Sequence, residues 1–150
     1  MQAAARPHGV PAGAEVALAF VDDDAMRVLN HRYRRKDKTT DVLSFGDELP
    51  DGVRGRDAAH RLVPGPDGVI QLGDVVISGA QAARQARRRR WPLASEVAFL
   101  AAHGVLHLLG YEDETNAGYR EMLALGRSAV ASARQRSVKR PDADTPRPLR

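Results

Sequence analysis

The segment that most restricts how this chain can fold is SEVAFLAAHGVLHLLG, at residues 95–110. Its apolar residues recur at 97, 100, 101, 104, 105 and 108, the spacing of one face of an α-helix. The opposite side also carries Phe99, Ala102 and Leu106. A helix that is apolar on all sides is buried on all sides. The segment therefore predicts a core helix, with Ser95 as its N-terminal cap and Gly110 as its C-terminal stop.

The rest of the sequence predicts further short elements around this helix. Residues 15–21, 39–45 and 69–78 are rich in apolar and β-branched residues and predict strands. Residues 23–34, 79–91 and about 115–136 predict helices, and the first dozen residues are expected to be loose. Residues 46–68 are polar and rich in glycine and proline, which predicts a long loop of the kind that often forms a functional flap. This order of elements indicates a single α+β domain over residues 1–136.

The composition excludes several kinds of chemistry. A chain of 150 residues that is 43% hydrophobic and 28% charged is typical of one soluble globular domain. It contains no cysteine, so a disulfide, a cysteine-ligated zinc or a thiol nucleophile is excluded. Any metal must be bound by histidine, aspartate, glutamate or water. The N-terminus lacks the apolar region of a signal peptide, and no apolar run approaches the ~20 residues that span a bilayer. We therefore expect a cytoplasmic protein without membrane contact.

The net charge of +4 is located in one part of the chain. Residues 134–150 hold six basic and two acidic side chains, and the remainder of the sequence is balanced. Residues 137–150 are Pro-rich and charged, and are expected to form a basic, disordered tail. Two local basic clusters stand out before it, HRYRRKDK at 31–38 and ARRRR at 86–90. Each could bind a phosphate backbone, and each could equally be a solvated helix face.

His103 and His107 are four positions apart in the predicted core helix, so both lie on one face and can bind one cation. An isolated pair with this spacing is more often two core histidines. Here Gly104 removes a side chain between the two rings, and Gly110 lets the chain turn back towards them. Asp113 in that turn completes the spacing H-x3-H-x5-D, and Glu112 or Glu114 could replace it if the turn is shifted. These residues predict a metal site.

The same spacing of metal ligands occurs in the metzincin-type motif, with aspartate here in place of the third histidine. Those proteases have their catalytic glutamate immediately after the first histidine, where this chain has Gly104. The predicted site could therefore bind metal as a protease does, but it lacks the protease's general base. This difference argues against peptide hydrolysis.

The segment HGVLHLLGY resembles the signature of the YbeY family, which reads H-G-x-L-H-L-x-G-Y-D-H. Two more segments resemble family blocks in the same order, LNHRYRRKDKTTDVLSF at 29–45 and LGDVVIS at 72–78. The resemblance covers residues 28–113. This chain departs from the signature at Glu112, where the family has aspartate, and at Asp113, where the family has its third metal histidine.

The resemblance implies a small α+β domain, with a sheet packed against helices and a zincin-like metal helix in a cleft. It implies a metal-dependent, single-strand-specific endoribonuclease of ribosomal RNA maturation and ribosome quality control, with ribosomal RNA and the small subunit as partners. One zinc ion is expected at His103, His107 and Asp113, and manganese is possible because a carboxylate favours harder cations. Arg34 would bind phosphate, and Arg35, Lys36 and Lys38 would extend the contact with the RNA backbone.

Other residues of these segments have expected roles outside the binding of metal and phosphate. Asp41 and Ser44 are expected to hold the strand edge near the cleft. Tyr111 could stack on a base or pack in the core. A second hypothesis for the whole protein is a non-catalytic ribosome-associated factor, in which Asp113 marks a structural or degenerate metal site.

Overall fold

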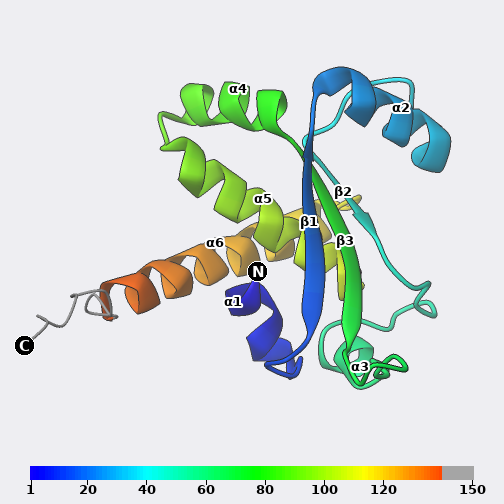
Figure 1. Cartoon of the computed structure of the whole chain (residues 1–150). Coiled ribbons are helices and arrows are strands. Elements are labelled where there is room, and N and C mark those ends of the chain that lie inside the picture. Colours follow the sequence, from blue (N-terminus) through cyan, green and yellow to red (C-terminus); the bar gives the residue numbers. More distant parts are fainter. Residues whose placement is uncertain (140–150) are drawn as a thin grey trace, which may run out of the picture.

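The centre of the fold is a three-stranded mixed sheet with the strand order β1–β3–β2. A computed structural model describes residues 1–139 of the chain (Figure 1). Strand β3 (Gln71–Ser78) lies in the middle of the sheet, parallel to β1 (Glu15–Val21) and antiparallel to β2 (Val42–Phe45). The prediction of an α+β fold built on a small mixed sheet is confirmed.

The central strand contributes to a hydrophobic core on each face of the sheet. Val75 and Ile77 point to one face, where they are fully buried beside helix α5 (Leu93–Leu108). Val76 points to the other face and packs with Met26 of helix α2 (Asp23–Arg34). Helix α6 (Asn116–Lys139) packs against α5 on the side away from the sheet (Figure 1). Helix α5 is therefore enclosed by the sheet and α6, as its apolar sequence predicts.

The start of α5 differs from its predicted start. The helix begins at Leu93, with Pro92 rather than Ser95 in the capping position. The backbone N–H of Ser95 already bonds to the carbonyl of Pro92, and its hydroxyl accepts a hydrogen bond from Arg134 of α6. The predicted cap is wrong because proline is favourable next to a helix N-terminus, where no backbone N–H is needed.

The expectation that the first dozen residues are loose is also wrong. Helix α1 (Gln2–Ala5) and a short 3₁₀ helix, η1 (Arg6–His8), occupy this segment, and α1 packs against α5 and α6. Ala3, Ala4 and Ala5 are buried there. Their small side chains allow a close approach between helices, a contribution that hydrophobic patterning alone does not reveal.

The other connections follow the predicted order with small changes. The predicted loop at 46–68 contains one helical turn, α3 (Arg56–Ala59), and helix α4 (Gly79–Arg89) follows β3. Helix α6 continues to Lys139, three residues beyond the predicted boundary at 136. The rest of the predicted tail, 140–150, lies outside the described residues. No helix within residues 1–139 has the length and apolar character needed to cross a membrane.

Candidate metal centre

The two histidines of α5 lie one turn apart, with their Nε2 atoms 3.1 Å from each other. Their ring centroids are 4.7 Å apart and the rings are almost perpendicular, at 83°. His103 and His107 are both only partly exposed, with side-chain exposures of 13% and 26%. The predicted histidine pair is thus formed, with both Nε2 atoms directed to one point.

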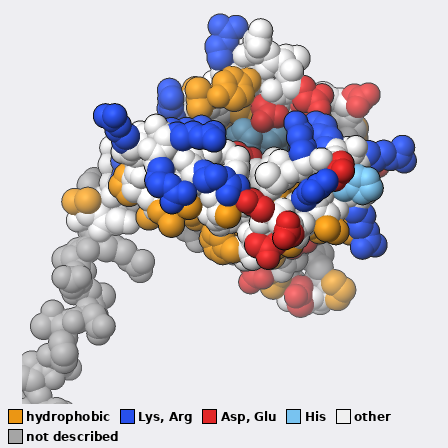
Figure 2. Space-filling model, turned by 90° about the horizontal axis from the view of Figure 1, so that it is seen from above, with side chains coloured by type: hydrophobic (Ala, Val, Ile, Leu, Met, Phe, Trp, Pro, Cys, Tyr) orange, Lys and Arg blue, Asp and Glu red, His pale blue; other side chains and the backbone are white. Residues whose placement is uncertain are grey.

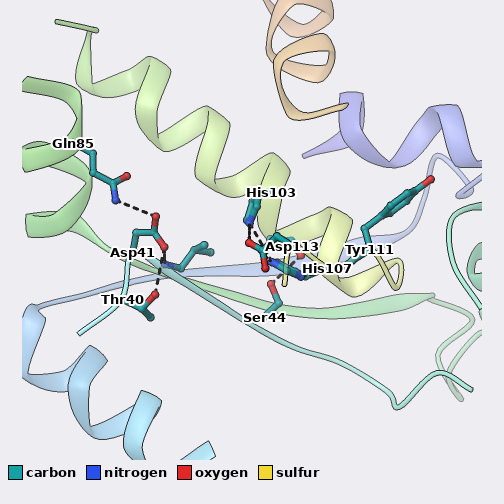
Figure 3. A network of polar contacts seen from close by, with 10 residues as sticks. Thr40, Asp41, Ser44, Gln85, His103, His107, Tyr111 and Asp113 are labelled. Atoms are coloured by element: carbon teal, nitrogen blue, oxygen red, sulfur yellow. Dashed lines mark hydrogen bonds and ion pairs between the residues drawn. The ribbon is translucent and has the colours of Figure 1, made fainter. Parts of the chain in front are cut away.

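Gly104 between them has a different role from the predicted one. A Cβ atom at this position would lie 2.5 Å from Cγ1 of Val75 and 3.2 Å from Oγ of Ser44. The hydroxyl of Ser44 donates a hydrogen bond of 2.9 Å to the carbonyl of Gly104. The glycine therefore allows α5 to contact the sheet, and it does not make room between the two rings. This contact fixes the height of both histidines above β2 and β3 (Figure 3).

The turn after α5 brings the third residue of the site back to the histidines. Gly110 has a φ of +82°, and a Cβ there would lie 2.3 Å from the carbonyl oxygen of Val53. Oδ2 of Asp113 then lies 3.1 Å from Nε2 of His103 and 3.7 Å from Nε2 of His107. Among the described residues, these three side chains form the one group with metal-ligand geometry.

The acidic neighbours of Asp113 do not join this group. Glu112 and Glu114 are both exposed and line the cleft beside the site. Of the three acidic residues in the turn, Asp113 is the one at metal-ligand distance from the histidines.

The donor atoms fit a divalent cation. Nδ1 of His107 is 2.9 Å from the carbonyl oxygen of Tyr111 and donates to it, which leaves a lone pair on Nε2. Nδ1 of His103 is buried and has no hydrogen-bond partner among the described residues. Unlike His107, His103 therefore has no protein acceptor that fixes its ring hydrogen on Nδ1. Ligand atoms in a tetrahedral zinc site are about 3.3 Å apart, given zinc–nitrogen bonds of about 2.0–2.1 Å. The two shorter separations here are close to that value.

The surroundings of His107 favour the neutral form of its ring. Burial is the main cause that lowers the pKa of His107 below its ordinary value, and the neighbouring His103 lowers it further. Asp113 and the carbonyl of Tyr111 act in the opposite direction, and Arg34 makes a smaller contribution that lowers this pKa. A neutral imidazole is the form that binds metal.

An acidic cleft of about 780 Å³ borders the site at His107. Its walls are the loop at 47–54, the turn after α5 and the start of α6. Arg54 in this wall pairs with Glu121 at 2.7 Å. Figure 2 shows histidine side chains at the bottom of a hollow whose rim carries both acidic and basic side chains. The predicted cleft is present, and part of the predicted flap forms one of its walls.

The predicted RNA-binding residues lie together at the end of α2. Arg34 is the last residue of that helix, and Arg35 follows it in the left-handed conformation, with a φ of 53°. Arg34, Arg35, Lys36 and Lys38 are exposed, and among residues 1–139 none of their side chains takes part in a hydrogen bond or ion pair. The amide of Asn30 donates to the carbonyl of Lys38 at 2.7 Å and holds this segment in place. Of the four, Arg34 is the one whose charge affects the pKa of His107.

Comparison with known proteins identifies the family. The sequence profile described as Endoribonuclease YbeY matches residues 1–134. The chain belongs to the YbeY family. It is 47% identical to Endoribonuclease YbeY of Moorella thermoacetica over 131 residues, which cover 87% of this chain and 80% of that protein. It is 45% identical to Endoribonuclease YbeY of Geobacillus thermodenitrificans over 121 residues, 81% of this chain and 74% of the relative.

A solved structure shows the same fold. The solution structure of TM1509 from Thermotoga maritima matches with a TM-score of 0.51, over 96% of this chain and 85% of that one. At 19% identity, this likeness concerns the fold alone. Membership of the YbeY family, whose members are named endoribonucleases, supports an RNA-cleaving role for the chain.

The structure also locates two other residues of the segments that resemble the family, Asp41 and Tyr111. Asp41 receives hydrogen bonds from the side chain of Gln85 at 3.0 Å and from the backbone of Val42 at 2.8 Å, so it joins α4 to β2 (Figure 3). Tyr111 is buried and packs against His8, with ring centroids 5.3 Å apart. Its ring therefore belongs to the core. The backbone carbonyl of Tyr111 orients His107. The sequence could not predict this role, because every residue has a backbone carbonyl.

Proposed function

We propose that this chain is a metal-dependent endoribonuclease that cleaves single-stranded RNA and acts in ribosomal RNA maturation and ribosome quality control. The observation that carries this proposal is the convergence of His103, His107 and Asp113 at the edge of a cleft, in a chain of a family named for RNA cleavage. Its substrate and partner would be ribosomal RNA within the small subunit, in the cytoplasm.

The residues around the site have distinct roles in this proposal. His103, His107 and Asp113 would hold one zinc ion, or manganese because the Asp113 carboxylate suits a harder cation. A bound metal ion supplies Lewis-acid stabilisation of phosphate and lowers the pKa of a water ligand. The carbonyl of Tyr111 keeps the hydrogen of His107 on Nδ1, so that Nε2 faces the site.

Arg34 would bind a phosphate oxygen of the RNA beside this centre. A guanidinium remains charged at all physiological pH values and can donate two parallel hydrogen bonds to a phosphate. Arg35, Lys36 and Lys38 would contact neighbouring phosphates, which provides affinity without sequence preference. Support comes from their exposure, their common location after α2 and the effect of Arg34 on His107.

The first experiment measures metal in the purified full chain by mass spectrometry, with His107→Ala and Asp113→Ala beside the wild type. Near-stoichiometric zinc or manganese that falls in both variants is expected. Metal that remains in Asp113→Ala would show that Asp113 is not required as a ligand. The absence of metal from all three proteins would favour the alternative, a non-catalytic ribosome-associated factor.

The second experiment measures cleavage of single-stranded RNA by Arg34→Gln. Loss of one group that stabilises charge in the transition state typically lowers kcat by about 100-fold or more, and we expect a loss of that size. Arg61→Gln is the matched control, because Arg61 is exposed on the loop after α3 and lies outside the site. Equal activity of the two variants would contradict the role of Arg34.

A further inference from the structure

A second hollow, of about 360 Å³, lies at the other end of α5. Its lining is mostly apolar, with two exposed arginines at its rim, and we call it the Trp91 groove. The residues that define it are the apolar Trp91, Phe99, Val130 and Ala131 and, at the rim, Arg127 and Arg134. It is separate from the acidic cleft, which lies against the opposite end of the same helix.

The indole of Trp91 is held firmly but remains accessible. Its exposed fraction is 38%, and it meets Phe99 edge-on with centroids 6.3 Å apart. The guanidinium of Arg89 lies 5.5 Å from the centroid of the Trp91 ring. Arg89 is fixed in turn by two bonds, of 2.8 and 3.0 Å, to the carboxylate of Glu96, which is fully buried. An aromatic ring that is already fixed in place loses little entropy when a planar ligand stacks on it.

The surroundings of the groove are positively charged. Between residues 79 and 111 the sequence has one acidic residue, Glu96, and between 122 and 139 it has none. Arg87, Arg88 and Arg90 are exposed next to Trp91, and within residues 1–139 neither they nor Arg127 pair with a carboxylate. Figure 2 shows several Lys and Arg side chains, with no Asp or Glu among them, on the left of the face in view. This charge favours a polyanionic ligand.

The groove and the metal centre contain residues from one face of α5. Ser95, Phe99, His103 and His107 are spaced by four residues, so their side chains follow one another along that face. The ring centroids of Phe99 and His103 are 6.2 Å apart. With a rise of about 1.5 Å per residue, Leu93 at the start of α5, two residues after Trp91, lies about 21 Å along the helix from His107. A single strand of several nucleotides that is bound at the metal centre is long enough to reach the groove.

We infer that the Trp91 groove binds single-stranded RNA at the end of α5 opposite the cleavage site. A base stacks on Trp91, and Arg127 and Arg134 bind the adjoining phosphates. Aromatic platforms with neighbouring basic side chains bind single strands without sequence preference, because every base has a face that can stack. Duplex RNA keeps its bases within its own stack. The inference rests on the proposed function only in taking RNA as the substrate.

Trp91 is the one tryptophan of the chain, so its fluorescence reports directly on the groove. The purified full chain is titrated with a 12-nucleotide oligouridylate, whose integrity is checked on a gel, and with inorganic polyphosphate. Saturable quenching by the oligouridylate and little change with polyphosphate are expected, because only the former can stack. Absence of quenching by the oligouridylate, or equal quenching by polyphosphate, would overturn the inference. Binding of a glutamate-rich peptide but not RNA would also overturn it, in favour of an acidic protein partner.

Paired arginine variants test whether the rim binds phosphate. Arg127→Gln/Arg134→Gln is compared with Arg56→Gln/Arg61→Gln, which removes the same charge from exposed positions at α3, outside the groove. For single strands, the slope of log affinity against log salt falls by about 0.7 for each phosphate that the protein no longer neutralises. We expect this reduction in the groove variant but not in the control. Equal slopes in the two variants would show that net charge, and not the groove, determines binding.

Cleavage kinetics separate this inference from the proposed function. The groove variant should raise KM for a long single strand about tenfold, as expected for the loss of about 1.4 kcal/mol of binding, and leave kcat unchanged. Unchanged KM with active enzyme would overturn the groove while leaving the proposed function intact. RNA that binds and quenches Trp91 without being cleaved would contradict the proposed function and leave the groove intact.

Discussion

Gly104 shows how a single residue can position the whole site. Replacement by alanine would normally strengthen a helix by about 1 kcal/mol. Here the added methyl group would lie 2.5 Å from Cγ1 and 2.9 Å from Cγ2 of Val75, a fully buried residue. Overpacking of this kind costs about 1–3 kcal/mol, so we expect Gly104→Ala to lower the free energy of unfolding in a urea titration.

A substitution at Val75, the residue that Gly104 approaches, provides the control for this prediction. Val75→Ala alone should destabilise the protein because it leaves a cavity, but it also removes the two methyl groups that Gly104→Ala would strike. The double variant should therefore lose less stability than the sum of the two single variants. A Gly104→Ala protein as stable as the wild type would show that α5 can move away from β3 without cost.

Residue-level prediction from the sequence succeeded where spacing determines geometry. The four-residue interval placed His103 and His107 on one face, and the glycine stop returned the acidic turn, with Asp113, towards them. It misjudged Gly104, because the partner that requires a glycine is Val75, 29 positions away in the sequence. The sequence left Asp113, Glu112 and Glu114 as alternative third ligands, because the path of the turn decides which carboxylate reaches the histidines.

At the scale of elements, two helices end on an arginine in the left-handed conformation. Arg35 follows α2 and Arg90 follows α4, with φ values of 53° and 55°. Glycine is the residue normally found at this position, because a Cβ atom makes the conformation unfavourable. Arg90→Gly should therefore raise the free energy of unfolding, by about 0.5–1 kcal/mol.

The matched variant is Arg88→Gly, two residues earlier and inside α4. There glycine should lower the free energy of unfolding by about 1 kcal/mol, because it loses more backbone entropy on folding. The two variants carry the same chemical change, so opposite signs in urea unfolding would isolate the backbone conformation. A decrease of stability in both would show that the side chain of Arg90 contributes more than its φ angle costs.

The sequence predicted the central elements better than the peripheral ones. Helix α5 and strand β3 were predicted because long apolar segments determine burial wherever they lie. Helices α1 and α3 are only four residues each, and short alanine-containing turns have no measurable periodicity. Their structure depends on packing against α5, α6 and neighbouring loops, which is tertiary information.

At the scale of the whole molecule, the N-terminal segment is joined to the turn that completes the site. The ring of His8 packs against Tyr111, and Nδ1 of His8 lies 3.5 Å from the hydroxyl of Tyr111. Tyr111 is also the residue whose carbonyl orients His107. Loss of the N-terminal packing should therefore disturb the metal centre. The sequence could not predict this connection, because its residues are 103 positions apart.

The burial of His8 and His107 predicts that the stability of the protein depends on pH. Burial lowers the pKa of His8, and nearby Arg56 lowers it further; burial likewise lowers the pKa of His107. The unfolded chain therefore binds more protons than the folded chain once the pH falls below about 6.5, the ordinary histidine pKa. The free energy of unfolding should be highest above that pH, and it should fall on acidification by at most about 1.4 kcal/mol per pH unit for each histidine.

Urea unfolding of the full chain in EDTA, at intervals between pH 5 and 8, measures this dependence without competition from metal. His8→Gln removes one of the two buried histidines. The free energy of unfolding of this variant should therefore decrease less steeply on acidification than that of the wild type. His60→Gln is the matched control, because it makes the same substitution at an exposed position on the loop after α3. If His8→Gln and His60→Gln gave the same profile as the wild type, His8 would titrate alike in the folded and unfolded chains. In that case the packing of the N-terminal segment on Tyr111 would not be what keeps this imidazole neutral.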